Sequence, residues 1–269
     1  MRFFAVTCLL TNLLFGCSNN ILSELGSKNS DDALIFDAKT AVNAQLYDSA
    51  INIITLKVSV SGQLKVQARE VLASAYAGKC GLNFINYTSG LATATTGSAF
   101  RLASAPFVGI PVLPASCLAS LLTLDLIGPN AQRTLNQNAF ASVVGMVLMG
   151  SATRFYTDNI PVNGDGVQDA VNISCGLTNA QIDNVILGYA YMAQNFSALS
   201  GQIGASSSTT ISGSITTCTA IAGSSCSNTD PTQITTQMRD TMRKLLNTVQ
   251  YGIGTRDGST ALLIQAACP

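Results

Sequence analysis

Residues 135–150 read LNQNAFASVVGMVLMG, and this stretch determines the fold class that the sequence predicts. From Phe140 and Val143 onward, apolar residues recur at helical spacing, and the end of the run is apolar nearly all round. A helix of that kind is typically buried on every side. Gly145 and Gly150 leave room for neighbouring helices to come close. We therefore expect a central helix inside an all-α bundle.

Helical spacing continues on both sides of this central stretch. Residues 31–81 predict consecutive helices with a break at 59–62, and Ser30 or Asp31 can cap the first of them. Thr178 caps a pattern of about twenty residues. Asp230 and the proline after it predict the start of another helix, and a short helical tail follows near the C-terminus.

The most apolar segment is residues 107–127, FVGIPVLPASCLASLLTLDLI. The segment is long enough for a transmembrane helix. Pro111 and Pro114 interrupt its first half, and the remaining dozen residues predict a buried core helix instead. The membrane span stays as the alternative.

Composition excludes several kinds of chemistry. The 269 residues carry 14 basic and 14 acidic side chains and no histidine. With zero net charge, the chain lacks the excess of positive charge that nucleic-acid-binding proteins typically carry. Without histidine there can be no Ser-His-Asp or Cys-His site and no imidazole-ligated zinc. We find no nucleotide-binding loop and assign no catalytic residue, so the sequence predicts that the protein is not an enzyme.

The chain has eight cysteines, and six remain when Cys8 and Cys17 near the N-terminus are set aside. The N-terminal sequence, described below, indicates export, and an even number of cysteines in an exported chain predicts disulfides. Cys218 and Cys226 lie within a Ser/Thr/Gly-rich segment, residues 200–229, which we predict to be a long, flexible, disulfide-stapled loop. The other four are predicted to form Cys80–Cys117 and Cys175–Cys268. Free thiols and metal-bound thiolates are the alternatives.

Residues 158–169, DNIPVNGDGVQD, resemble part of a calcium-binding loop. Asn163, Asp165 and Asp169 match oxygen-ligand positions of that loop, whereas Pro161 and Asn172 stand where a first ligand and a bidentate glutamate belong. Such residues also form Asn-Gly and Asp-Gly turns unaided. Calcium is therefore a candidate ligand, the only cofactor that the sequence suggests.

The N-terminus carries an export signal. One positive charge, an apolar run and a small residue before the cleavage point are typical of secretory signals, and LFGC at residues 14–17 resembles the lipobox of bacterial lipoproteins. That resemblance implies a signal peptide at 1–16 and acylation of Cys17. Ser18 after it implies sorting to the outer membrane, with the protein on its periplasmic face. An ordinary signal, cut elsewhere, is the alternative.

The domain plan follows from these segments. Residues 17–30 are predicted to be a lipidated tether, and residues 31–269 a helical domain. Within it, the alanine spacing at 38–44 and YDSAI at 47–51 resemble the helix pair of a tetratricopeptide repeat, which implies a short solenoid. The architecture also resembles, more distantly, the lipoprotein T-component of tripartite periplasmic transporters. An ordinary amphipathic hairpin explains the same residues.

Three classes of function fit the sequence. The first is a lipid-anchored helical scaffold that binds protein partners, or a small apolar ligand, in the cell envelope. The second is a structural envelope component without a ligand. The third is an enzyme that works without histidine, through a carboxylate or lysine of perturbed pKa.

Overall fold

The computed structural model describes residues 28–93, 98–166, 168–170, 173–222 and 226–268, and over these residues the protein is all-α. The described chain forms twelve α-helices and no strand. Extended backbone pairs there only in a single bridge between Thr248 and Arg256. The predicted fold class is therefore confirmed. The predicted signal peptide, Cys17 and nearly all of the tether lie outside the described residues.

The first helices form a small N-terminal unit, which we define as residues 28–79. Its elements are α2 (Asp31–Asn43), α3 (Tyr47–Asn52), the π-helical η1 (Ile53–Lys57), α4 (Val60–Gln63) and α5 (Val66–Lys79). Ser30 caps α2, as predicted, by accepting a hydrogen bond from the Ala33 amide at 3.3 Å. Asp31 and Asp32 in the first turn place negative charge beside the positive end of the helix dipole, which stabilises the helix.

The remaining helices form the body, which we define as residues 84–268. They are α6 (Phe84–Thr93), α7 (Ala99–Ser104), α8 (Pro114–Asp125), α9 (Leu135–Thr157), α10 (Asn179–Leu199), α11 (Ala205–Ala222), α12 (Thr236–Leu246) and α13 (Ala261–Gln265). Thr134 and Thr178 start the two longest helices with capping boxes. The helix predicted to open at Asp230 begins later, at Thr236, because a 3-10 turn at Pro231–Gln233 comes first.

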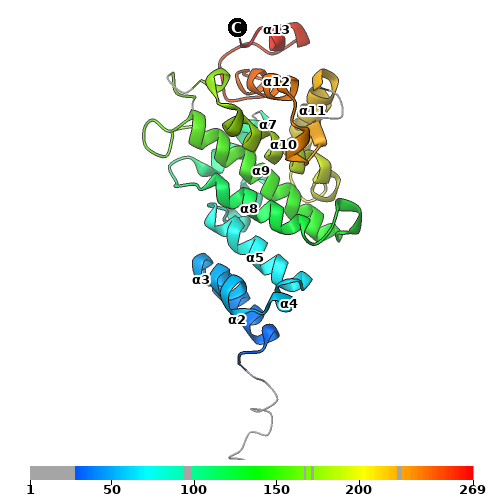
Figure 1. The fold of residues 1–269 in the computed structure, drawn as a ribbon. Coiled ribbons are helices and arrows are strands. Elements are labelled where there is room, and N and C mark those ends of the chain that lie inside the picture. The colour runs from blue at the N-terminus through cyan, green and yellow to red at the C-terminus, as the bar shows by residue number, and fades with distance from the viewer. Residues whose placement is uncertain (1–27, 94–97, 167, 171–172, 223–225, 269) are drawn as a thin grey trace, which may run out of the picture.

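Helices α9 and α10 form the centre of the body and run side by side in Figure 1. Glycines allow their backbones to touch: a Cβ atom at Gly145 would lie 2.7 Å from the Gly188 carbonyl oxygen, and one at Gly188 would lie 2.5 Å from the Met149 amide nitrogen. Among the described helices, only α9 is long and apolar enough to cross a membrane, and 83% of its most apolar window is buried inside the protein. The prediction of a central helix is confirmed.

The apolar segment at 107–127 supplies α8, which starts at Pro114. Cys117, Leu121 and Leu124 on this helix are buried in the main core. At twelve residues, α8 is too short to span a bilayer and packs between α5 and α9 as a core helix.

The predicted loop at 200–229 is wrong over most of its length, because residues 205–222 form α11. A buried stripe of Ser207, Ile211, Ser214 and Cys218 recurs at helical spacing on its inner face. The Ser207 hydroxyl donates to the Leu91 carbonyl at 2.6 Å. Exposed threonines of α11 donate to carbonyls one turn earlier, which satisfies their hydroxyls within the helix.

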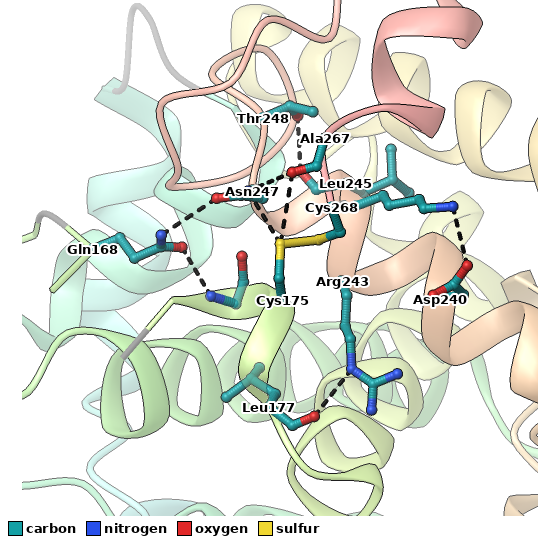
Figure 2. Close-up of a disulfide and its surroundings, with 12 residues drawn as sticks. Gln168, Cys175, Leu177, Asp240, Arg243, Leu245, Asn247, Thr248, Ala267 and Cys268 are labelled. Atoms are coloured by element: carbon teal, nitrogen blue, oxygen red, sulfur yellow. Dashed lines mark hydrogen bonds and ion pairs between the residues drawn. A yellow bond between two sulfur atoms is a disulfide. The ribbon is translucent and has the colours of Figure 1, made fainter. Parts of the chain in front are cut away.

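All three disulfides form as predicted: Cys80–Cys117, Cys175–Cys268 and Cys218–Cys226. Figure 2 shows how the second one secures the C-terminal tail. Beside it, the Asn247 amide donates to the Ala267 carbonyl at 2.7 Å, and Gln168 donates to the Asn247 side-chain oxygen at 3.3 Å.

The N-terminal unit and the body have separate hydrophobic cores that meet at α5. Ala68 and Ala75 of this helix belong to the first core, whereas Ala73 and Ala77 belong to the second. The Arg69 guanidinium donates to the carbonyl of Leu126, the C-cap residue of α8, and so links α5 to α8. The molecule is elongated, with the start of α2 at one end and α13 at the other (Figure 1).

Candidate functional site

A groove runs along the N-terminal unit to its junction with the body. Its first section, 620 Å³, lies between α2 and α5, and its second, 490 Å³, continues past Val42, Asn43 and Ser74 to α6 and the start of α9. The two sections share those three residues, so they adjoin. We call them together the interhelical groove. Each section by itself has a volume within the range of ordinary ligand-binding clefts.

Large apolar side chains stand exposed along this groove. Phe36 is 68% exposed beside the first section, and Ile85 is 74% exposed beside the second. Phe84 also lines the second section, with its ring centroid 6.4 Å from that of Phe140. Apolar side chains gathered at a concave surface are typical of interaction sites.

Charges at the groove largely cancel. Asp32 and Lys65 form an ion pair at 2.6 Å, and Asp32 raises the pKa of Lys65 through that contact. The Glu70 carboxylate accepts a hydrogen bond from Gln137 of α9 at 2.8 Å, and Lys39 adds a second cation. With two cations and two anions lining the first section, binding there would depend mainly on apolar contact.

Close packing in the N-terminal unit sets the walls of the groove. A Cβ atom at Gly78 would lie 2.2 Å from the Tyr47 ring, so this glycine lets α3 rest directly on α5. At the other end of the unit, the Asp31 carboxylate accepts hydrogen bonds from the Ser59 amide at 2.8 Å and from its hydroxyl at 2.6 Å. These two contacts hold α2, α3 and α4 around α5.

A polar cluster lies where the end of α8 and the start of α9 meet α10. Arg133, which is buried, donates to Asp125 at 3.3 Å and to Asn195 at 3.4 Å, and the Tyr191 hydroxyl donates to Asp125. Burial raises the pKa of Asp125, and the hydrogen bonds from Tyr191 and Arg133 partly oppose this. These contacts link the ends of α8 and α9 to α10.

In the calcium-like loop, Asp158 and the candidate ligand Asp169 accept hydrogen bonds from backbone amides. Asp158 accepts hydrogen bonds from the Asp165 and Gly166 amides at 2.9 and 2.8 Å. Asp169 accepts from the amides of residues 159 and 160, and Asn163 adopts a left-handed φ of 69°. Within the described residues, no group of three or more acidic, cysteine or histidine side chains is placed to hold a metal ion. Calcium binding here remains a prediction.

Asp158 is the loop residue that sequence reasoning undervalued. It was not assigned as a ligand from the sequence, yet it is 2% exposed and organises the turn. Burial raises its pKa, against the two amide hydrogen bonds. Arg154, one turn earlier on α9, is 1% exposed, and within the described chain its Nε and Nη1 atoms have no hydrogen-bond partner. Burial lowers the pKa of Arg154, and the charge of Asp158 partly compensates.

Comparison with protein families, curated proteins and solved structures gives no match to this chain. The tetratricopeptide and T-component resemblances therefore remain predictions from the sequence. What can be argued about function comes from the interhelical groove and from the N-terminal sequence.

Proposed function

We propose that this chain is a lipid-anchored protein of the bacterial cell envelope whose interhelical groove binds an apolar segment of a partner protein. The observation that carries the proposal is the groove itself, with Phe36, Phe84 and Ile85 exposed along it. The anchor is the acylated Cys17 that the lipobox resemblance implies. The proposed location is the periplasmic face of the outer membrane.

The shape of the groove favours a chain segment over a small molecule. Two adjoining sections run along α2 and α5 toward α6 and α9, rather than forming one enclosed chamber. A long, open, partly apolar channel between helices matches the way amphipathic segments are bound, with apolar anchors at intervals. A small apolar ligand held in the first section alone is the second candidate.

The absence of histidine from the sequence, together with the paired charges around Asp125, supports a binding role over catalysis. A structural component without a ligand is the remaining alternative. It differs from the proposal in one respect that can be tested, because it leaves the groove empty.

Site-specific photo-crosslinking tests the groove. A benzoylphenylalanine at Ile85, 74% exposed in the groove, is compared with one at Leu262, 80% exposed at the far end of the molecule. We expect a discrete cross-linked partner from the first position and none from the second. Equal labelling at both positions, or none at either, contradicts the proposal.

A purified partner then gives the decisive measurement. Replacing Phe36 and Ile85 with serine should weaken its affinity by about tenfold for each side chain, as expected for apolar anchors. Leu262→Ser, a matched loss of an exposed leucine, should leave the affinity unchanged. If Phe36→Ser and Leu262→Ser behave alike, the groove is not the binding site.

The anchor is tested separately. Inhibition of the lipoprotein signal peptidase should cause the uncleaved precursor to accumulate, and the N-terminal fragment of the native protein should carry the mass of acyl chains on Cys17. A free Cys17 thiol in the native protein contradicts the anchor, and leaves the groove experiment valid.

A further inference from the structure

The corner of the N-terminal unit around α4 exposes an unusual group of apolar side chains. Leu56 is 77% exposed, Val60 80% and Leu64 62%, and Val66 beside them is 40% exposed. We call these four residues the α4 corner. They lie within eleven residues of sequence, and none of them belongs to either hydrophobic core. Single exposed apolar residues are ordinary, whereas a group of them indicates a contact surface.

The corner is held together by the side chain of Gln63. Its amide nitrogen donates to the Thr55 carbonyl at 3.3 Å and to the Val58 carbonyl at 3.0 Å. These bonds tie α4, which carries Val60, to η1, which carries Leu56. The shape of the corner is therefore fixed by its own hydrogen bonds.

The folded chain begins at this same corner. Asp31, at the start of α2, is bonded to Ser59 through both the amide and the hydroxyl, and a Cβ atom at Gly62 would lie 2.4 Å from the Asp31 carboxylate. Figure 1 shows α4 and the start of α2 at the same end of the molecule, opposite α13.

The proposed anchor is close to this end. Eleven residue steps separate Cys17 from Lys28 in the sequence, and a chain of that length spans at most about 40 Å. An acylated Cys17 would therefore hold the α4 end of the molecule near the lipid surface. Contact with lipid would cover the exposed apolar side chains of that end.

We propose that the α4 corner is a membrane-contact surface, on which Leu56, Val60 and Leu64 enter the boundary between headgroups and acyl chains. The proposal rests on the lipid anchor proposed above. Nearby charges nearly balance, since Lys65 is paired with Asp32, so the contact is apolar and should form on zwitterionic lipid. Lys57, exposed within the same corner, can extend its ammonium group to the phosphate level.

This orientation also places the first section of the interhelical groove close to the membrane. Lys65, which lies between Leu64 and Val66 of the corner, lines that section together with Asp32, its ion-pair partner. A partner segment bound there would be one presented near the lipid surface, which narrows the choice of partner to membrane proteins or other anchored chains.

Tryptophan fluorescence tests the contact, because the chain has no tryptophan of its own. Val60→Trp and Leu262→Trp replace two side chains that are each 80% exposed, at opposite ends of the molecule. Each lipidated full-length variant is reconstituted into phosphatidylcholine vesicles that contain brominated phosphatidylcholine. We expect bromine to quench the fluorescence of Val60→Trp and to leave that of Leu262→Trp unchanged. No quenching at either position overturns the proposal.

Further measurements on the same variants test the proposal in other ways. A blue shift of Val60→Trp without bromine quenching would mean that a second copy or a protein covers the corner, and would overturn the proposal. In the unlipidated Cys17→Ser chain, quenching should persist at high lipid concentration. There, Leu56→Ser and Leu64→Ser should each weaken partitioning by about tenfold. If the native Cys17 is unmodified, the anchor fails, yet this last arm still decides whether the corner binds lipid.

Discussion

The N-terminal unit and the body are built from the same kind of helix but are stabilised very differently. Over the described residues, the core of the unit holds eight buried residues, five of them alanine, whereas that of the body holds 42, including Tyr189, Phe100 and Leu148. Because burial energy scales with apolar area, the body should carry most of the stability of the chain. The groove and the α4 corner belong largely to the weaker region.

The polar contacts differ in the same direction. In the N-terminal unit, the ion pairs Asp32–Lys65 and Asp48–Lys79 are exposed, and pairs of that kind contribute little. Two of the three disulfides lie entirely within the body, and the third, Cys80–Cys117, ties the end of α5 to α8. A small core next to a binding surface is what an adaptable element requires, because segments that rearrange on binding come from the less stable parts of a protein.

The largest expected effect is the loss of Cys175–Cys268, whose partners are 93 residues apart. Closing a loop of that length stabilises a protein by about 4.7 kcal/mol in the chain-entropy model. We expect the Cys175→Ser/Cys268→Ser variant to lose roughly that much unfolding free energy in denaturant titration. Cys218→Ser/Cys226→Ser, which opens a separation of eight residues, should lose about 2 kcal/mol less. Equal losses would show that loop entropy does not govern these bonds.

The second effect separates the two regions directly. Ile54, 1% exposed, is one of three residues larger than alanine in the core of the unit. Ile54→Ala should cost about 2–4 kcal/mol. Hydrogen exchange should then accelerate throughout residues 31–63 while the body keeps its protection. Leu56→Ala, two residues away and 77% exposed, is the control and should change little. If the body loosens as well, the two regions fold as one cooperative unit.

A glycine comparison within the body measures how tightly its central helices pack. A Cβ atom at Gly188 meets backbone of α9 at 2.5 Å, whereas one at Gly213 in α11 meets nothing within 4 Å. Gly188→Ala should therefore destabilise by about 1–3 kcal/mol. Gly213→Ala should stabilise by about 0.5–1 kcal/mol through helix propensity. Relative to the wild-type protein, the melting temperature of Gly188→Ala should fall and that of Gly213→Ala should rise. Shifts of the same sign would contradict the packing argument.

The body was easier to predict from the sequence than the candidate site. The apolar pattern of α9, the Thr178 cap and the short separation of Cys218 and Cys226 are local signals, and each was sufficient. The predicted pairing of the other four cysteines agrees with the structure, although their spacing alone leaves it open. Helix α11 was missed because its Ser/Thr/Gly composition is typical of loops, although the buried positions from Ser207 to Cys218 follow helical spacing. A test of periodicity applied before composition would have found it.

The groove could not be predicted, because it forms between segments that are far apart in the sequence. Its second section combines Tyr47, Ser74, Ile85 and Phe140, from four helices, and no local pattern relates them. In the calcium-like loop, the same oxygens suit either a cation or backbone amides. Only the geometry shows that Asp158 and Asp169 are engaged by amides.

The smallest effect concerns the hydrogen bonds that hold α2 to α4, and it depends on pH. The Ser59 hydroxyl, followed by the Ser59 amide, holds the pKa of Asp31 below its ordinary value. A carboxyl whose pKa is lowered by folding stabilises the folded state above its unfolded pKa, about 3.9, and loses that contribution as the pH falls through the folded value. Acidification below about pH 4 should therefore loosen the contact between Asp31 and Ser59.

Amide exchange at residues 59–63, corrected for the intrinsic rate at each pH, measures this loosening. We expect protection to fall between pH 5 and pH 2.5, values that bracket the pKa of about 3.9 expected for an unfolded aspartate. The Asp31→Asn variant should show weaker protection at both values and little dependence on pH. Asp230 is the counterpart in the body, since bonds from the Thr232 side chain and amide lower its pKa in the same way. Protonating Asp230 should open only its own turn, because the large core beneath it stays closed. If acid loosens α12 as much as α4, then the size of the core does not set the difference between the two regions.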